Sequence, residues 1–287
     1  MTSMPFFSII IPALNEEKYL PLLLKDLSRQ TTTNFEVIVV DGHSDDKTVQ
    51  KAKEYSSKLP QLTLINSPLR NVSHQRNLGG MKAAGDYIIF MDADNRLPEY
   101  FLEGIKYKLH STKAELFTCW CAPDSVFQSN KTIATIINMG VEASKLADNP
   151  YAMGAFIGCT RKLFLKSKGF NVKIAFAEDA EFVRRCYKKG CRYLIFRDPR
   201  FILSLRRLRS TGKLKLLQKY ASLHLKNFTQ IPINQEKEYP MGGGYLELTS
   251  SDRPESILGN LQQALKSIAQ KPKIIQKIRS LILSEED

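Results

Sequence analysis

Phe6-Phe-Ser-Ile-Ile-Ile-Pro-Ala-Leu-Asn-Glu-Glu17 sets the fold of the N-terminal part of this chain. Residues 6–11 form a short apolar run rich in β-branched side chains, and Pro12 bounds it; this is the pattern of a buried strand. Asn15 is a good N-cap, and the apolar residues after it recur at helical spacing. The segment therefore predicts a strand, a short loop and a helix capped by Asn15.

The same alternation continues along the first hundred residues. We predict further strands at 35–40, 62–65 and 87–91, and further helices from Ser44 or Asp45 to about 58, at 73–84 and at 99–110. Strands that alternate with helices at this pace form a parallel sheet covered by helices on both faces. The fold class is therefore α/β, with a Rossmann-like, mostly parallel sheet flanked by helices.

The alternation is weaker after residue 98. Strands are expected at 115–121 and 192–196, and helices at 129–147, 161–169 and 177–189. A C-terminal helical extension follows, predicted as a basic helical stretch at 206–228, a loop at 232–244 and an amphipathic helix at about 254–282.

The composition of the chain is that of a folded protein with a positive surplus. It has 287 residues, 43% of them hydrophobic, with 42 Lys plus Arg against 29 Asp plus Glu, a net charge of +13. Residues 1–110 are neutral, so the surplus lies downstream and favours an anionic partner: a phosphorylated ligand, a membrane surface or nucleic acid. A solvated basic surface is the simpler alternative.

Membrane spans, secretion and structural zinc are not expected. The apolar runs are far shorter than the roughly 20 residues that cross a bilayer, and the chain does not open with a signal-peptide pattern. Its 5 cysteines are an odd number without repeated CxxC spacing, so free thiols in a reducing, cytoplasmic compartment are expected.

Three polar segments follow the ends of predicted strands, namely residues 12–15, 41–42 and 92–94. Ligands of parallel α/β sheets bind beyond the carboxyl ends of the strands, so these segments are expected to meet in one crevice. The chain contains neither GxGxxG nor GxxxxGK[ST], so neither a dinucleotide fingerprint nor a Walker loop explains the crevice.

Asp92-Ala-Asp94 carries the sharpest chemical signal. Alternate residues of an extended segment face the same side, and two carboxylates held together need a positive partner. Mg²⁺ or Mn²⁺ satisfies oxygen ligands and can bridge them to a diphosphate. Two solvated loop aspartates are the alternative.

Asp41 and Arg76 add two weaker candidates. A carboxylate at a strand end can accept hydrogen bonds from a ribose or a base, although Asp41 before Gly42 also suits a simple turn. Arg76, on the helix preceding the fourth strand, can reach a diphosphate, or can be an ordinary surface arginine.

Four motifs together resemble the family 2 glycosyltransferases, whose fold is called GT-A. They are Phe7-Ser-Ile-Ile-Ile-Pro-Ala-Leu-Asn-Glu-Glu17, Val40-Asp-Gly-His-Ser-Asp-Asp-Lys-Thr48, Arg76-Asn77 with Ala84-Gly85, and Phe90-Met-Asp-Ala-Asp94. Each motif alone is weak, but the four occur in order at family spacing. The resemblance covers roughly residues 6–200.

The resemblance implies a nucleotide-diphosphosugar donor, a Mg²⁺ or Mn²⁺ cofactor, and transfer with inversion at the anomeric carbon. Matching positions imply that Asp94 ligates the metal and that Asp92 orients the ribose–metal region. The other implied donor contacts are Pro12, Ala13, Leu14 and Asn15 at the base, Asp41 at base or ribose, Arg76 at the phosphates, and Ala93 between the two aspartates. Many relatives have a second acidic residue where this chain has Gly42, so the resemblance leaves the base contact to Asp41 alone.

Downstream, Gly158-Cys-Thr-Arg-Lys-Leu-Phe164, Gly169-Phe170 and Glu178-Asp179 resemble the acceptor half of the family. There the aspartate, here Asp179, is the favoured general base with Glu178 beside it. An inverting displacement needs a carboxylate to take the acceptor's proton, although the pair also suits a helix N-terminus. The QxxRW motif is missing, so a processive synthase is not expected.

These assignments divide the chain into three parts. Residues 1–110 are expected to bind the nucleotide-sugar, residues 111–205 to hold the acceptor and catalytic half of the same domain, and residues 206–287 to form the basic extension. The acceptor is expected to be a glycan or a lipid-linked hydroxyl.

Residues 197–219 hold eight basic side chains among interleaved leucines, which suits peripheral attachment to the anionic inner face of the cell membrane. The alternative is a solvated helix that packs its leucines on the core.

Three other readings remain open. A polyprenyl-phosphate glycosyltransferase keeps the fold but needs no base, because its acceptor is already ionised. A basic nucleic-acid-binding protein would explain the charge, but no zinc spacing, RNP-like stripe or helix-turn-helix supports it, so no nucleic acid is expected. An inactive scaffold with an intact donor fold is the last alternative.

Overall fold

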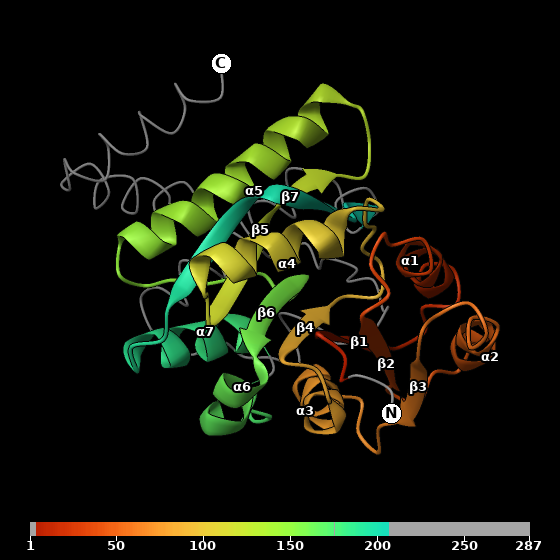
Figure 1. The fold of residues 1–287 in the computed structure, drawn as a ribbon. Coiled ribbons are helices and arrows are strands. Elements are labelled where there is room, and N and C mark those ends of the chain that lie inside the picture. Colours follow the sequence, from red (N-terminus) through yellow and green to blue (C-terminus); the bar gives the residue numbers. More distant parts are fainter. Residues whose placement is uncertain (1–3, 175, 207–287) are drawn as a thin grey trace, which may run out of the picture.

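The computed structural model describes residues 4–174 and 176–206. They form one seven-stranded sheet in the order β3-β2-β1-β4-β6-β5-β7 (Figure 1). The strands are β1 (Phe7–Ala13), β2 (Phe35–Asp41), β3 (Leu62–Asn66), β4 (Tyr87–Met91), β5 (Leu116–Pro123), β6 (Phe156–Thr160) and β7 (Tyr193–Leu203). Only β6 runs against its neighbours, so the predicted α/β fold with a mostly parallel sheet is confirmed.

Helices cover both faces of the sheet. The apolar side chains of alternate strand residues form two clusters, one on each face, as expected for strands buried on both sides. One face packs against α1 (Leu20–Leu27), α2 (Thr48–Lys53), α4 (Phe101–Thr112) and α5 (Gln128–Leu146). The other packs against α3 (Val72–Lys82), α6 (Arg161–Ser167) and α7 (Glu178–Lys188).

The parallel register brings the polar strand ends to one edge of the sheet. Ala13 at the end of β1 pairs with Asp41 at the end of β2, and β4 runs parallel to β1 on its other side. The segments after β1, β2 and β4 therefore leave the sheet at the same edge, which is where the sequence places the crevice.

Strand β6 was not predicted. Its five residues, Phe156–Thr160, pair antiparallel with both β4 and β5. Gly158 interrupts the apolar run, which weakens a strand pattern, but the sheet requires a glycine there. An added Cβ would lie 2.0 Å from the Phe117 ring, so only a residue without a side chain fits.

Two predicted helix starts are wrong. The first helix begins at Leu20 rather than after Asn15, and the second begins at Thr48 rather than after Ser44 or Asp45. In both cases the polar side chains that suit an N-cap bind loop backbone instead: Asn15 Oδ1 accepts the Asp45 N–H, and Ser44 Oγ accepts the Asn15 N–H. Asn, Asp and Ser side chains accept backbone N–H groups in loops as readily as at helix N-termini.

Most of the predicted C-terminal extension, with its basic helical stretch, its loop and its terminal helix, lies outside the described residues. Among the residues that are described, no helix is long and apolar enough to cross a membrane. Two of the eight basic residues at 197–219, Arg197 and Arg200, lie in β7, with their guanidinium groups 5.1 and 5.0 Å from the centre of the Trp120 ring. Attachment to a membrane surface stays a prediction.

Candidate active site

Hydrogen bonds tie the loops after β1 and β2 together around Asp41. Asp41 is buried, and its two carboxylate oxygens accept the Ser44 N–H at 2.9 Å and the Ser44 hydroxyl at 2.5 Å. Ser44 in turn accepts the Asn15 N–H at 2.9 Å. Asn15 and His43 have positive φ angles of 56° and 61°, a conformation that asparagine tolerates better than most residues. The loops therefore have a defined shape, with Asp41 engaged in its own turn.

Gln75 on α3 fixes the base of these two loops. Its side-chain amide donates to the Ala13 carbonyl at 2.9 Å and to the Val40 carbonyl at 2.8 Å. An added Cβ at Gly42 would lie 3.0 Å from the Gln75 nitrogen. Gln75 therefore fills the space that a side chain at position 42 would need, which is why Gly42 suits this chain.

Arg76, the next residue on α3, faces the end of β4. Only 2% of the residue is exposed, and its guanidinium donates to Glu178 Oε1 at 2.7 Å, to Asp92 Oδ1 at 3.2 Å and to the Gly154 carbonyl at 3.2 Å. Its Nε has no hydrogen-bond partner among the residues that the structure describes. Arg76 thus joins two of the predicted site segments, 92–94 and 178–179, which are far apart in the sequence.

Asp179 is held at the start of α7 by backbone N–H groups. Its Oδ2 accepts the Gly154 N–H at 2.6 Å and its Oδ1 accepts the Ala180 N–H at 2.7 Å. The first turn of a helix favours negative charge, so the carboxylate is both oriented and stabilised there. Ala177, just before the helix, has a φ angle of 59°, a costly conformation for alanine.

Gly154 lies between Arg76 and Asp179. A Cβ at this position would lie 2.5 Å from Arg76 Nη2 and 3.2 Å from Asp179 Oδ2. Its N–H binds the carboxylate and its carbonyl binds the guanidinium, so any side chain here would separate the two groups.

The carboxyl group of Glu178 is perturbed by its surroundings. Burial and the neighbouring Asp179 raise its pKa to about 7, against the opposing effect of Arg76. Glu178 therefore holds a proton more readily than an exposed glutamate does. Perturbed carboxyl groups of this kind are characteristic of functional sites.

Asp94 is paired with an arginine from the far end of the described chain. Arg206 Nε donates to Asp94 Oδ2 at 2.8 Å, and both of its terminal nitrogens bind the Glu16 carboxylate. The guanidinium also lies 4.2 Å from the centre of the Tyr19 ring. Asp94 is thus linked through Arg206 to Glu16, the residue after Asn15.

The charges of the crevice suit a cation. Among the described residues, the site includes the carboxylates of Asp41, Glu16, Asp92, Asp94, Glu178 and Asp179, and the guanidinium groups of Arg76 and Arg206 are bonded to four of them. Arg184 adds a positive charge that acts on Asp179. Carboxylates still outnumber cations in a chain whose net charge is +13.

Asp92 and Asp94 offer the hard oxygen ligands that Mg²⁺ and Mn²⁺ prefer. The described residues contain no group of three or more His, Cys, Asp or Glu side chains able to hold a metal by themselves. The two aspartates therefore offer only part of the ligand set that a divalent cation needs, and one of them, Asp94, is ion-paired with Arg206 in this structure.

The structure brings most of the predicted site residues to one edge of the sheet. Hydrogen bonds and ion pairs connect Asn15 with Asp41 through Ser44, and connect Asp92 with Glu178 through Arg76. Pro12 and Ala13 are buried at the end of β1, and Leu14 is half-buried. Ala93 is buried in a turn after β4, where the Asn95 N–H donates to the Asp92 carbonyl at 3.2 Å, so the segment 92–94 is not extended as expected. The individual contacts of Pro12, Ala13, Leu14 and Ala93 with a donor stay predictions, as do those of Asp41, Arg76, Asp92 and Asp94.

Sequence reasoning missed Gln75, Gly154 and Arg206. Gln75 and Gly154 have no motif of their own, since each acts through contacts made across the fold. Arg206 was assigned to the C-terminal extension from its basic neighbours. Its buried ion pairs depend on β7 returning the chain to the crevice, which no local pattern indicates.

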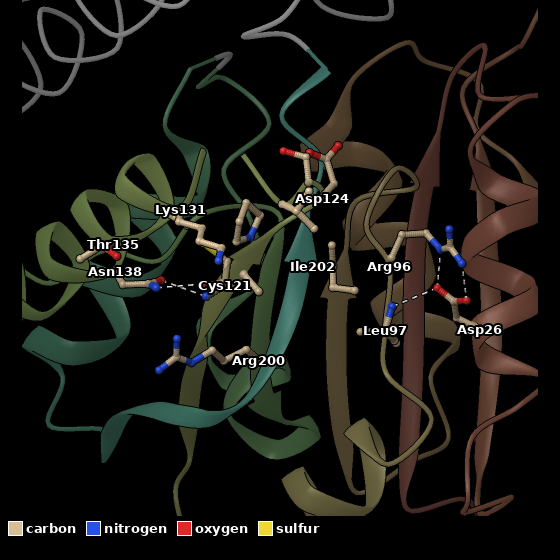
Figure 2. A pocket seen from close by; sticks show the side chains of 15 residues that line it. Asp26, Arg96, Leu97, Cys121, Asp124, Lys131, Thr135, Asn138, Arg200 and Ile202 are labelled. Atoms are coloured by element: carbon tan, nitrogen blue, oxygen red, sulfur yellow. Dashed lines mark hydrogen bonds and ion pairs between the residues drawn. The ribbon is translucent and has the colours of Figure 1, made fainter. Parts of the chain in front are cut away.

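A cavity of about 960 Å³ lies beside this site, between α5 and the ends of β5 and β7 (Figure 2). Its wall includes Arg96, Lys131 and Arg200, but none of the predicted donor residues. A backbone bridge between Arg96 and Ile202 connects it to the segment that carries Asp94. The residues that line the cavity are therefore different from those of the acidic site.

The pair between Asp26 and Arg96 anchors the loop after Asp94 to α1 (Figure 2). The Asp26 carboxylate accepts Arg96 Nε at 2.5 Å, Arg96 Nη2 at 2.7 Å and the Leu97 N–H at 3.0 Å. Bidentate pairs with an additional backbone donor are among the stronger polar contacts in proteins.

We expect Asp26→Asn to lower the free energy of unfolding by about 1–3 kcal/mol, because the new amide nitrogen would face donors in a buried position. Urea denaturation measures the change. The matched control is Asp45→Asn, which breaks the exposed pair with Arg70 and is expected to cost less than about 1 kcal/mol. Equal effects of the two substitutions would contradict an anchoring role for Asp26.

The fold, a mostly parallel seven-stranded sheet covered by helices, is that of a GT-A glycosyltransferase. The chain matches the model of glycosyl transferase family 2 over residues 8–167, more than half of its length, and it belongs to that family.

Among its curated relatives is an uncharacterized glycosyltransferase of Haemophilus influenzae, 29% identical over 190 residues, which are 61% of this chain and 60% of the relative. The poly(ribitol-phosphate) β-N-acetylglucosaminyltransferase TarS of Staphylococcus aureus is 24% identical over 70% of this chain and 36% of its own. The 4,4'-diaponeurosporenoate glycosyltransferase of Staphylococcus haemolyticus is 44% identical over 34% of this chain and 27% of its own. The chain thus spans 60% or less of the length of these relatives.

Two solved structures share the fold. TarS residues 1–349 in complex with UDP-GlcNAc match with a TM-score of 0.57 and 21% identity, over 77% of this chain and 66% of that one. The mannosyltransferase PcManGT of Pyrobaculum calidifontis, in complex with GDP-Man and Mn²⁺, matches with a TM-score of 0.64 and 20% identity, over 98% and 81% of the two chains.

Proposed function

We propose that this protein is an inverting glycosyltransferase that moves a sugar from a nucleotide-diphosphosugar to an acceptor hydroxyl. The observation that carries the proposal is the single network of Asp92, Arg76, Glu178, Gly154 and Asp179 at the carboxyl edge of the sheet. It joins the segment expected to hold the donor to the carboxylate expected to act on the acceptor.

Asp179 is suited to take a proton from the acceptor. One of its oxygens is held by the Gly154 N–H and the other by the Ala180 N–H, so its carboxylate has one orientation. Each oxygen has a further lone pair that can accept the acceptor hydroxyl. A fixed carboxylate within hydrogen-bond reach of the hydroxyl acts as a general base as the oxygen attacks the anomeric carbon.

Arg76 and Glu178 position the two halves of the site. The buried guanidinium binds Asp92 on one side and Glu178 and Gly154 on the other, so the distance between the Asp-Ala-Asp segment and Asp179 is set by one side chain. Holding donor and acceptor groups in a fixed arrangement is a major part of the acceleration that transferases can provide.

Asp94, with Asp92 next to it, would hold Mg²⁺ or Mn²⁺, which when bound neutralises charge on the departing diphosphate. Without a cation, the surplus of carboxylates would repel that diphosphate. Asp41, with Pro12, Ala13, Leu14 and Asn15, would contact the base and ribose. The solved neighbours bind UDP-GlcNAc and GDP-Man, so both donors are candidates for this chain.

For the acceptor we propose a chemical class, a hydroxyl group of a glycan or of a lipid-linked molecule, and no particular compound. The printed names of the relatives include a poly(ribitol-phosphate) transferase and a diaponeurosporenoate transferase, so glycan and lipid-linked hydroxyls both remain candidates.

Donor binding tests the proposal. With Mn²⁺ and either UDP-GlcNAc or GDP-mannose, we expect the melting temperature of the wild type to rise, since a ligand at about 100 times its Kd stabilises by about 2.7 kcal/mol. Asp94→Ala is expected to abolish the rise. The control Glu99→Ala, which removes an exposed acid five positions later, should keep it.

If neither donor, with or without Mn²⁺, shifts the melting temperature of the wild type, and a wider set of nucleotide-sugars also fails, the proposed function is wrong. A shift that persists in Asp94→Ala would refute the metal role of Asp94 alone.

A further inference from the structure

Arg206 was expected to contribute only to the positive charge of the C-terminal extension, but its guanidinium lies among the acidic residues of the candidate site. It donates to the carboxylates of both Asp94 and Glu16, and its side chain is 12% exposed. Tyr19 covers one face of the guanidinium. A cation with two carboxylate partners and an aromatic neighbour is firmly held.

The backbone just before Arg206 is fixed as well. The Leu205 N–H donates to Asp124 Oδ2 at 3.2 Å, and the Leu205 side chain packs against Ile133 of α5. The bridge between Arg96 and Ile202 holds the same segment to the loop that carries Asp94. The backbone contacts of residues 202 and 205 therefore place Arg206 near Asp94, and its ion pairs then hold the side chain there.

We propose that Arg206 is the counter-cation of Asp94 in the donor-free protein and competes with the divalent cation for this carboxylate. The inference rests on the proposed function, in which Asp94 ligates the metal. Since Arg206 Nε already binds Asp94 Oδ2, a metal ion that arrives alone must break a buried ion pair and meet a nearby positive charge.

This competition has a functional consequence. A cation that arrives with a nucleoside diphosphate brings negative charge that offsets Arg206, whereas a bare cation does not. Arg206 therefore makes metal binding depend on the nucleotide, so that metal and donor enter the site together. The reaction then avoids a state in which the metal is bound without its substrate.

Titration calorimetry with Mn²⁺ alone tests this, using the wild type, Arg206→Gln and Arg200→Gln. Arg200→Gln is the matched control, because it removes the same charge from an arginine that lies over Trp120. We expect Arg206→Gln to bind Mn²⁺ at least tenfold more tightly than the wild type, and Arg200→Gln to bind it as the wild type does.

A second variant separates this effect from damage to the fold. Glu16→Gln neutralises the Glu16 carboxylate that shares the Arg206 guanidinium with Asp94, so less of the positive charge of Arg206 is offset by Glu16. It is expected to bind Mn²⁺ more weakly than the wild type. The two variants thus shift the affinity in opposite directions, whereas partial unfolding would weaken binding in both.

Equal Mn²⁺ affinity of the wild type and Arg206→Gln, when both bind Mn²⁺ in the presence of UDP or GDP, would overturn this inference and leave the proposed function standing. An equal increase in Mn²⁺ affinity for Arg206→Gln and Arg200→Gln would also overturn the inference, because the change in net charge alone would then explain the increase. No Mn²⁺ binding by any variant, with or without UDP or GDP, would overturn both the inference and the metal-dependent function.

Discussion

Replacing Asp179 with Asn is expected to lower turnover by about 10²–10⁴-fold, the usual contribution of a general base. Asparagine has nearly the same shape, and its carbonyl oxygen can still accept the Gly154 N–H that now binds Asp179 Oδ2. Its amide nitrogen would then face the Ala180 N–H that now binds Oδ1, so the substitution removes the basicity of the group and one of its two backbone contacts. Steady-state rates with a responsive donor and acceptor measure the effect.

Glu181→Gln is the matched control for this experiment. Glu181 lies two residues further along α7, and its carboxylate pairs with Arg185 rather than with the crevice. The control changes the net charge of the helix by the same amount, so we expect turnover near that of the wild type.

Near-normal turnover of Asp179→Asn, together with intact donor binding, would exclude base catalysis by Asp179. That result would favour the alternative acceptor, a polyprenyl phosphate, which is already ionised and needs no base.

Arg76→Met is expected to have the largest effect on stability. The guanidinium holds Glu178 and Asp92 in a nearly closed environment, and removing one partner of a buried ion pair typically costs about 3–5 kcal/mol. Most of the loss comes from Glu178, whose side chain is 11% exposed, whereas that of Asp92, at 39%, can turn to water. Urea denaturation measures the loss.

Two further variants test this explanation. Arg70→Met removes an arginine whose side chain is 50% exposed, and is expected to cost less than about 1 kcal/mol. The double variant Arg76→Met with Glu178→Gln should recover part of the lost stability, because the stranded carboxylate is gone. If Arg76→Met lowers the free energy of unfolding as little as Arg70→Met does, the buried network does not stabilise the fold.

The sequence predicted the sheet best where its strands are buried on both faces. The runs that became β1, β2 and β4 are continuous and apolar, because helices pack on both sides of them. Strand β6 was missed because Gly158 interrupts its pattern, and the requirement for that glycine comes from Phe117 on the neighbouring strand. A glycine that is required because a side chain on the neighbouring strand fills the space leaves no periodic pattern in the sequence.

The residues of the candidate site also fall into two groups, those that the sequence could identify and those that only the structure reveals. Asp92, Asp94 and Asp41 could be selected from the sequence, because they follow apolar strands, where ligands of α/β sheets bind, and because they stand in motifs that resemble the family. The partners of these residues could not be selected. Gly154 and Arg206 lie about 60 and 110 positions from Asp94 along the chain, and only the fold shows that they contact the crevice.

The amino-acid order by itself determined the class of fold, the edge of the sheet at which polar groups gather, and the family to which the chain belongs. These follow from local hydrophobic patterns and short motifs, which act over a few residues. Only the tertiary structure decided which charges face one another: Arg76 with Asp92 and Glu178, and Arg206 with Asp94 and Glu16. Such pairs form between segments that the sheet brings together, so their energies depend on burial and distance in space, quantities that sequence spacing does not contain.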